Sequence, residues 1–332
     1  MLVPESMPRL KEYVDSVNLE LRELYPSTHA TALEGAVADA LSGGGKRVRA
    51  ALALLWCEVF SGDYRPAVPL AVAYELAHAS ALVQDDIIDR SDMRRGRESV
   101  VAKYGLPTAI LASDLLLFNV PKMVARYSNL ESRRLARIFD LVGEACRATT
   151  WGEFLDLEMA LGRDGAEKDY EEMIRLKTST LLSAPCASGA IVAGASDEQV
   201  SIADRFGEAL GMAYQMQDDA LDLVGDEAVL GKPIFTDLRG GKKSIVLIHC
   251  ASRCSAGDRR FIFGLLNRSG PYEKDEISRL KALIEENGSL DYVRQKVLRF
   301  TRKAKDSLAT IPESRARSLL MELTDYLATR YY

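Results

Sequence analysis

Residues 82–89 read Leu82-Val83-Gln84-Asp85-Asp86-Ile87-Ile88-Asp89 and place three carboxylates in an otherwise apolar helical pattern. Successive residues of an α-helix differ by about 100° in direction, so Asp85 and Asp89 share one face and Asp86 flanks them. Carboxylates in this arrangement repel one another when no cation is bound. A divalent cation that prefers oxygen ligands could be coordinated by them. The stretch alone therefore leaves two interpretations open, a metal site or a solvated acidic face.

A second copy of the pattern favours the metal site. Met216-Gln217-Asp218-Asp219-Ala220-Leu221-Asp222 repeats the spacing behind a glutamine, again within an apolar helical pattern. Two matched acidic faces predict two helices that direct carboxylates into one cleft. Because Mg²⁺ is usually held by a few carboxylates together with substrate phosphates, the pattern points to a metal-bound diphosphate.

The composition bounds the class of protein. A chain of 332 residues with 47% hydrophobic content can bury a large core, as one helical domain or as two smaller ones. A formal net charge of −5, with no block of cations among aromatics, argues against a nucleic-acid partner. The five cysteines are odd in number and lack C-x-x-C spacing, so neither a disulfide framework nor a zinc site is favoured. The sequence shows no signal-peptide pattern and no apolar run of about 18 residues, so we expect a cytoplasmic protein without stable membrane insertion.

Helical periodicity extends along the whole chain, without a convincing series of alternating strands and hairpin signals. The sequence predicts an all-α fold, a large bundle with its polar site between facing helices. Helices are expected over 51–60, 68–89, 108–125, 132–159, 169–195 and 202–223. Lys177-Thr178-Ser179-Thr180 is expected to interrupt the helix over 169–195, because hydroxyl side chains compete for backbone hydrogen bonds.

Cationic loops accompany both acidic clusters. One cationic loop is Ser42-Gly43-Gly44-Gly45-Lys46-Arg47-Val48-Arg49, in which three glycines allow a tight turn directly before the cations. Lys46 and Arg49 are spaced about one helical turn apart, which suits binding of a diphosphate. A helix C-cap followed by solvated cations is the alternative. Arg94-Arg95-Gly96-Arg97 either neutralises the first cluster or holds phosphate oxygens, and a glycine- and lysine-rich loop over 231–244 follows the second cluster.

Other catalytic arrangements are missing from the sequence, which contains no Ser-His-Asp or Cys-His set, no P-loop and no dinucleotide-binding glycine pattern. The chemistry would then come from polarising a diphosphate until it leaves an electron-deficient carbon. An apolar helical cavity protects such a carbon from water. His78, about two turns before the first aspartates, is either a satisfied core residue or part of this site.

With these motifs together, the chain from Gly43 to the C-terminus resembles the trans-isoprenyl diphosphate synthases, the family of farnesyl, geranylgeranyl and longer polyprenyl diphosphate synthases. The resemblance implies the isoprenoid synthase fold, as a single domain over 1–332 around a central cavity. It also implies a homodimer and three Mg²⁺ ions per active site. The reaction would be head-to-tail condensation of isopentenyl diphosphate with an allylic diphosphate. The allylic diphosphate ionises, the isopentenyl double bond attacks, and a proton is lost to give an all-trans product.

The resemblance also implies roles for individual residues. Those that would bind Mg²⁺ directly are Asp85, Asp89 and Asp218, and those that would complete the two clusters are Asp86, Asp219 and Asp222. Isopentenyl diphosphate would be held by Lys46, Arg49, His78 and Arg95. The allylic diphosphate would be held by Arg94, Lys177, Lys232 and Lys242. Oxygens near the developing allylic cation would come from Thr178 and Gln215.

Two other activities fit part of the pattern. A class I terpene cyclase shares the first aspartate motif, but it would carry an Asn/Ser/Glu motif in place of the second. A non-catalytic regulatory subunit would usually lose one aspartate cluster, and this chain keeps both. The sequence therefore favours an elongating synthase. Phe235 stands where the family commonly has glycine, which leaves the conformation of the Lys232 loop open.

Product length depends on the residues below the first aspartates. Ala77, Ser80 and Ala81 are small, whereas family members that stop at farnesyl usually carry a bulky aromatic at the position of Ser80. This favours geranylgeranyl or a somewhat longer product. Tyr74 is either part of the cavity floor, with Leu116 or Phe118 beside it, or a residue of the core or subunit interface.

Overall fold

The computed structural model describes residues 7–26, 30–42, 45, 47–162, 166–224, 234–266, 268 and 271–328. In this part of the chain the all-α prediction is confirmed, because the regular structure is helical apart from one short hairpin. The strands of that hairpin, β1 (Met93–Arg94) and β2 (Arg97–Glu98), pair antiparallel. Lys46 and Lys232, two of the cations predicted to bind substrate, lie outside the described residues.

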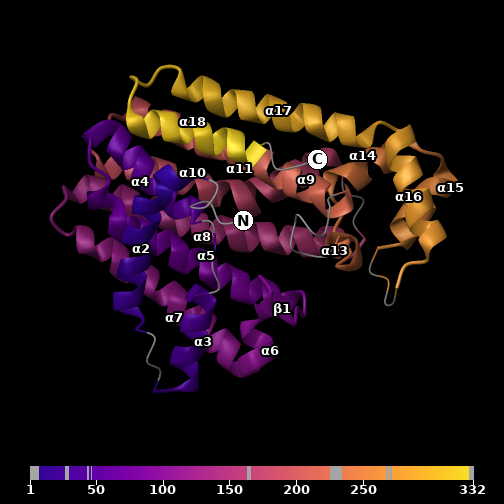
Figure 1. Cartoon of the computed structure of the whole chain (residues 1–332), viewed down its shortest axis with the longest axis horizontal. Helices are drawn as coiled ribbons and strands as arrows, with labels where there is room; N and C mark the ends of the chain where they lie inside the picture. Colours follow the sequence, from indigo (N-terminus) through magenta and orange to yellow (C-terminus); the bar gives the residue numbers. More distant parts are fainter. Residues whose placement is uncertain are drawn as a thin grey trace.

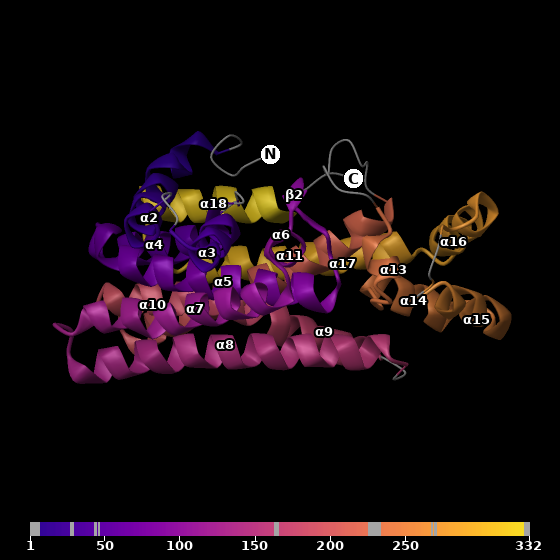
Figure 2. The same ribbon diagram turned by 90° about the horizontal axis from the view of Figure 1, so that it is seen from below.

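Long helices packed side by side form the body of the molecule (Figures 1 and 2). α5 (Val68–Ile88) packs against α7 (Leu106–Val124), and α11 (Asp197–Val224) packs against both α10 (Thr180–Val192) and α17 (Ser289–Leu308). α8 (Ser132–Ala160) runs along one side of the bundle, where Figure 2 shows its full length. The other described helices are η1 (Pro8–Leu10), α2 (Lys11–Leu24), α3 (Ala32–Ser42), α4 (Val48–Ser61), η2 (Arg65–Ala67), α6 (Val100–Tyr104), η3 (Ala125–Tyr127), α9 (Glu167–Ile174), η4 (Arg175–Ser179), α13 (Thr236–Arg239), α14 (Ile245–Arg253), α15 (Ala256–Gly264), α16 (Lys274–Glu286) and α18 (Arg315–Ala328).

The apolar core has two parts that share helices. The larger part surrounds α4, α5, α7 and α10, and the smaller one lies between α9, α14, α16 and the end of α11. α11 contributes Phe206 to the first part and Met216 to the second, and α17 contributes Leu308 and Val293 in the same way. Because two long helices pass through both parts, this packing favours the predicted single domain.

α5 is the central helix, and its sequence explains why. Residues 70–77 are all buried, and Glu75 is the one charged side chain among them, so this part of the helix is surrounded by core on every side. A helix that is hydrophobic all round belongs in the interior of a large domain. The aspartate cluster therefore lies at the end of a helix that is packed against neighbouring helices on all sides.

The predicted interruption of the helix over 169–195 is present as η4, a π-helical turn between α9 and α10. Thr180 stabilises the widened turn, because its hydroxyl donates to the carbonyl oxygen of Arg175, five residues earlier, at 2.9 Å. π-helical turns of this kind often lie at functional sites. This one carries Lys177 and Thr178.

Two described segments, Arg65–Ile88 and Leu106–Tyr127, are long and apolar enough to cross a membrane by length and composition. The first is 67% buried within the molecule, as expected of a core helix, and core helices of soluble proteins pass the same test. The second is 44% buried. Its exposed apolar side chains are Leu106, Ile110, Leu111 and Phe118.

Candidate active site

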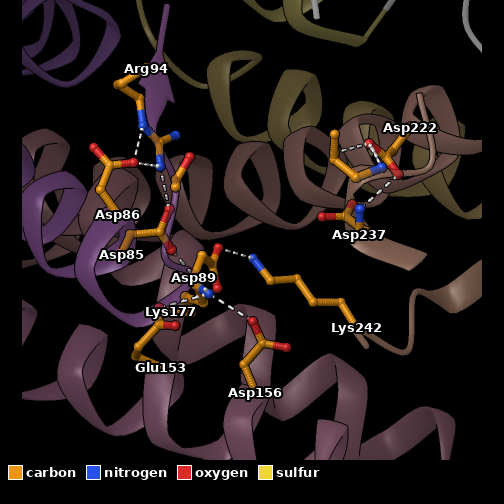
Figure 3. Close-up of polar contacts among 12 residues, drawn as sticks. Asp85, Asp86, Asp89, Arg94, Glu153, Asp156, Lys177, Asp222, Asp237 and Lys242 are labelled. Atoms are coloured by element: carbon orange, nitrogen blue, oxygen red, sulfur yellow. Dashed lines mark hydrogen bonds and ion pairs between the residues drawn. The ribbon is translucent and has the colours of Figure 1, made fainter. Parts of the chain in front are cut away.

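The first aspartate cluster lies at the C-terminal end of α5, where Asp89 is the C-cap residue. Three cations from separate parts of the chain converge on it (Figure 3). Arg94 of the hairpin places a guanidinium nitrogen 2.8 Å from Asp85 Oδ2 and 2.6 Å from Asp86 Oδ1. The other two are Lys242, with Nζ 2.9 Å from Asp89 Oδ2, and Lys177, with Nζ 3.9 Å from Asp85 Oδ1.

These cations favour the ionised form of Asp85. Burial raises the pKa of Asp85, but Lys242, Lys177 and Arg94 together outweigh it and hold the pKa below its ordinary value. Burial also raises the pKa of Asp86, and Arg94 opposes only part of that rise. Asp85 is therefore the carboxylate best prepared to bind a metal ion, while Asp86 is 2% exposed and directed toward the hairpin.

The hairpin separates the two arginines that the sequence assigns to different substrates. Arg95 and Gly96 both have positive φ, 54° and 76°, as a two-residue mirror-image turn requires. Arg94 extends to the aspartates of α5, whereas Arg95 turns toward Gly45, where an added Cβ would lie 2.7 Å from Arg95 Nη1. The two guanidinium groups thus face different sites.

The site around Arg95 is strongly positive. His78 is half-buried, and burial together with the charges of Arg49, Arg95 and Arg47 lowers its pKa well below the ordinary value, so the imidazole is neutral. Burial lowers the pKa of Arg49 as well, and its Nε has no hydrogen-bond partner among the described residues. Concentrated positive charge with an unsatisfied buried donor is suited to an anion such as a diphosphate.

Arg47 serves a different purpose from its neighbours in the glycine-rich loop. It turns inward, where Nη1 lies 2.9 Å from Glu75 Oε2 and Nη2 donates to the carbonyl oxygen of Leu41 at 2.8 Å. Its Nε donates to Asn18 at 3.2 Å. Arg47 thus holds its part of the chain against the core.

Two aspartates of the second cluster accept hydrogen bonds from other parts of the protein, which the sequence does not indicate. Asp222 is 0% exposed, and its two oxygens accept hydrogen bonds from the backbone N–H groups of Thr236 (3.2 Å) and Asp237 (3.0 Å) and from the Thr236 hydroxyl. Asp222 therefore satisfies the first two backbone N–H groups of α13, whose N-cap residue is Phe235. Asp219 is also buried and accepts from Tyr170 and Gln215. The metal-binding role expected of Asp219 and Asp222 stays a prediction, and in this structure their oxygens accept hydrogen bonds from the protein. Asp218 is half-buried.

The donor set fits a hard divalent cation through Asp85, Asp89 and Asp218, since carboxylate oxygens are the ligands that such ions prefer. Among the described residues, no three Asp, Glu, His or Cys side chains lie ready to hold an ion as they stand. The physical reason is the set of ion pairs above, in which Arg94, Lys177 and Lys242 neutralise the carboxylates. A metal diphosphate would bring positive metal ions for the carboxylates and negative phosphate oxygens for Arg94, Lys177 and Lys242. The carboxylates and these cations could then separate from one another.

Two acidic residues of α8 belong to the site, although sequence reasoning gave them no role. Lys177 Nζ lies 2.7 Å from both Glu153 Oε2 and Asp156 Oδ2. Gly152 permits this approach, because a Cβ there would lie 2.3 Å from the backbone nitrogen of Lys177. Burial alone would lower the pKa of Lys177, but Asp156, Glu153 and Asp85 raise it above the ordinary value. A pair of acids three residues apart in an apolar helical pattern, directly after a glycine, is the signal that could have found them.

Thr178 and Gln215, predicted to act together, are in contact. Thr178 Oγ1 donates to Gln215 Oε1 at 2.8 Å, and Gln215 Nε2 donates to Asp219 Oδ1 at 2.8 Å. Burial raises the pKa of Asp219 to about 7, although hydrogen bonds from Tyr170 and Gln215 lower it. Tyr170, whose hydroxyl donates to Asp219 Oδ2 at 2.7 Å, had no predicted role.

The sequence model of the polyprenyl synthetase family matches residues 30–284. The chain belongs to this family. A geranylgeranyl diphosphate synthase of Methanosarcina mazei is 32% identical over the full length of both chains, and a geranylfarnesyl diphosphate synthase of Aeropyrum pernix is 34% identical over 90% of this chain and 94% of the relative. The crystal structure of geranylgeranyl pyrophosphate synthetase from Pyrococcus horikoshii superposes with a TM-score of 0.92 at 31% identity, covering 98% of each chain.

This polyprenyl synthetase is therefore a prenyltransferase, and the resemblance drawn from its motifs is confirmed. Its family uses isoprenoid diphosphate substrates and a divalent metal. The all-α fold predicted from its periodicity is also the fold of the matched synthases. The roles of individual residues remain predictions.

Phe235 of this polyprenyl synthetase has a φ of 61°, in the left-handed region that glycine adopts freely and a phenylalanine does not. The side chain compensates by packing into the smaller core, where it is 7% exposed with Lys281 Nζ 5.5 Å from its ring centre. The backbone N–H of Phe235 donates to the carbonyl oxygen of Asp222 at 2.7 Å. The substitution therefore anchors the start of α13, while Lys232 itself lies outside the described residues.

The residues below the first aspartates are polar as well as small. Ser80 of α5 and Ser113 of α7 share a hydrogen bond of 2.9 Å, and Tyr74 shares one of 2.8 Å with Ser188 of α10. Tyr74 is 1% exposed, in keeping with either a floor or a core position. Of the two side chains expected beside Tyr74, Leu116 is 0% exposed, whereas Phe118 is 69% exposed and does not lie in the interior.

Proposed function

We propose that this polyprenyl synthetase condenses isopentenyl diphosphate with an allylic diphosphate, head to tail, to give all-trans geranylgeranyl diphosphate or a somewhat longer product. The observation that carries the proposal is the presence of two anion sites of different kinds. One combines carboxylates with Arg94, Lys177 and Lys242 and needs a metal, and the other has Arg49 and Arg95 beside a neutral His78 and needs none. Two diphosphate substrates, of which only one loses its diphosphate, match these two sites.

Asp85, Asp89 and Asp218 would hold three Mg²⁺ ions, whose charge would help the allylic diphosphate to leave. The cations paired with carboxylates in the free protein have a second task in this proposal. Lys177, Lys242 and Arg94 would exchange those carboxylates for diphosphate oxygens, and Lys232, outside the described residues, would join them. The carboxylates they leave would then be ready to bind the metal.

The remaining residues hold the second substrate and the cation. Arg49, Arg95 and Lys46 would bind isopentenyl diphosphate so that its double bond faces the allylic carbon. The oxygens of Thr178 and Gln215 would stabilise the positive charge as it develops. The proton lost afterwards would pass to the departed diphosphate.

A second copy of the chain is the partner we propose. Neighbouring helices α7 and α8 expose large apolar side chains over 106–118 and 139–161. They are Leu106, Ile110, Leu111, Phe118, Phe139, Trp151, Phe154, Leu157 and Leu161. Monomeric proteins seldom leave so many large apolar side chains in water, and a two-fold homodimer would cover them. Phe154→Glu together with Phe118→Glu should give a monomer by light scattering, and an unchanged mass would contradict this interface.

The activity is tested with purified protein, Mg²⁺, isopentenyl diphosphate and each of dimethylallyl, geranyl and farnesyl diphosphate. We expect all three primers to be extended to the same set of long products. Cyclic hydrocarbons formed without consumption of isopentenyl diphosphate would instead indicate a terpene cyclase. Extension that needs an added second synthase would indicate a regulatory subunit. Asp85→Asn is the inactive control, because it removes a ligand charge while keeping the side-chain shape.

A further inference from the structure

Four side chains form one line of hydrogen bonds beside the allylic site. The Tyr170 hydroxyl of α9 donates to Asp219 of α11, Gln215 of the same helix donates to the other oxygen of Asp219, and Thr178 of η4 donates to Gln215. Tyr170 is 0% exposed, and Asp219 and Thr178 are 7% and 6% exposed. The three contacts measure 2.7, 2.8 and 2.8 Å between donor and acceptor atoms. The proposed function uses Thr178 and Gln215 but gives Tyr170 no part.

The direction of these bonds follows from the carboxylate. An ionised carboxylate only accepts hydrogen bonds, so Tyr170 and Gln215 both donate to Asp219. The Gln215 amide is therefore turned with its NH₂ group toward Asp219 and its carbonyl oxygen toward Thr178. Because the Thr178 hydroxyl donates its single proton to that carbonyl oxygen, it offers only lone pairs to any other neighbour.

This orientation determines whether the pair stabilises or opposes a cation. Oxygen lone pairs directed at a developing positive charge stabilise it, and an N–H or O–H group directed at the same place does the reverse. If the Gln215 amide were reversed, its NH₂ group would face Thr178, whose hydroxyl proton would then be available to point at the substrate. A carboxylate held in place behind Gln215 prevents that reversal.

We propose that Tyr170 is a positioning residue that, through Asp219, locks the Gln215 amide in the orientation that presents oxygen lone pairs to the allylic cation. The inference rests on the proposed function and deepens it. Asp219 then belongs to this line of hydrogen bonds and not to the metal ligands. Tyr170 touches neither substrate, and its effect on the reaction passes entirely through Asp219 and Gln215.

Tyr170→Phe tests the proposal because it keeps the buried ring and removes only the hydroxyl. In this variant kcat should fall about 10- to 100-fold, the range for losing a hydrogen bond to a charged group. KM for each substrate should stay within about twofold, because the cations that bind the diphosphates are untouched.

Tyr292→Phe is a matched control. The Tyr292 hydroxyl of α17 donates to Glu167 of α9 at 2.6 Å, so it also links α9 to a neighbouring helix through a tyrosine and a carboxylate. It does not contact Asp219. We expect an unchanged kcat for this variant, and a loss equal to that of Tyr170→Phe would mean that both hydroxyls simply dock α9, which would overturn the proposal.

A double-mutant cycle with Gln215→Leu isolates the route through the amide. Once the amide is gone, Tyr170→Phe should cost nothing further in kcat. The same loss in both backgrounds would overturn the proposal. If Tyr170→Phe does not fold, Asp219→Asn takes its place in the cycle: a loss that disappears in the Gln215→Leu background supports the proposal, and a loss that persists overturns it. An inactive wild type would refute the proposed function, whereas an active wild type with a fully active Tyr170→Phe variant refutes this inference alone.

Discussion

The buried ion pair between Arg47 and Glu75 gives the sharpest test of how the glycine-rich loop is held. The side chains are only 11% and 3% exposed, and Glu75 also accepts from the backbone N–H of Ala50 at 3.3 Å. Glu75→Gln preserves the packing but leaves the Arg47 charge without a counter-charge. Removing one partner of a buried pair costs about 3–5 kcal/mol, and we expect about 3 kcal/mol because the amide oxygen still accepts from Arg47.

Thermal unfolding followed by circular dichroism measures this cost. The midpoint should fall by about 4 °C, because the entropy of unfolding of a chain of 332 residues is about 0.7 kcal/mol/K. Asp39→Asn is the matched control, because it makes the same change of acid to amide in a more exposed pair, in which Asp39 Oδ2 lies 2.7 Å from Lys103 Nζ with side chains 36% and 47% exposed. The control should lose less than about 1 kcal/mol.

Activity completes the test, because the loop held by Arg47 carries Lys46 and leads to Arg49. Glu75→Gln should raise KM for isopentenyl diphosphate several-fold and leave KM for the allylic primer within about twofold. A midpoint shift no larger than that of Asp39→Asn would refute the assignment of Arg47 as the anchor. Equal increases in both KM values would refute the link between this loop and one substrate.

Three further outcomes are expected. Excess chelator should abolish turnover and added Mg²⁺ restore it, because the crowded carboxylates around Asp85 repel a diphosphate unless cations intervene; turnover in chelator would contradict the metal mechanism. Arg94→Ala should raise KM mainly for the allylic primer and Arg95→Ala mainly for isopentenyl diphosphate, as steady-state kinetics with each substrate varied will show; the reverse pattern would mean that the two sites are exchanged. Ser80→Phe should shorten products toward farnesyl, because it places a bulky ring below the aspartates. Chromatography measures the product lengths, and an unchanged distribution would mean that residue 80 does not set the chain length.

Much of the fold was predictable because its signals are local. The apolar pattern over 68–89 predicted a helix that the structure places at Val68–Ile88, and the pattern over 132–159 predicted one found at Ser132–Ala160. The hydroxyl-rich stretch at 177–180 predicted an interruption because it competes with backbone hydrogen bonds within the same segment. In each case the cause and its effect lie within a few residues of each other.

The contacts of buried polar side chains were not predictable in the same way. Asp222 accepts from the first backbone N–H of α13, 14 residues away, and Tyr170 meets Asp219 across 49 residues. Nothing in the local pattern around Asp222 distinguishes an aspartate that binds metal from one that accepts backbone hydrogen bonds. The difference lies in which donors the folded chain brings to its oxygens.

The order of the amino acids was enough to predict a helical protein, two aspartate clusters and cationic loops like those of prenyl synthases, and small residues below the first cluster. These predictions follow from helical periodicity and from residue types at fixed spacing, which are both local features of the sequence. Which charged side chains face one another depends on how the helices pack. The tertiary structure turned Arg94 and Arg95 apart, drew Glu153 and Asp156 to Lys177, and buried Phe235 in a strained conformation. The physical reason is that electrostatic and hydrogen-bond partners are chosen by distance in space, and helices separated by many residues reach those distances only after they pack.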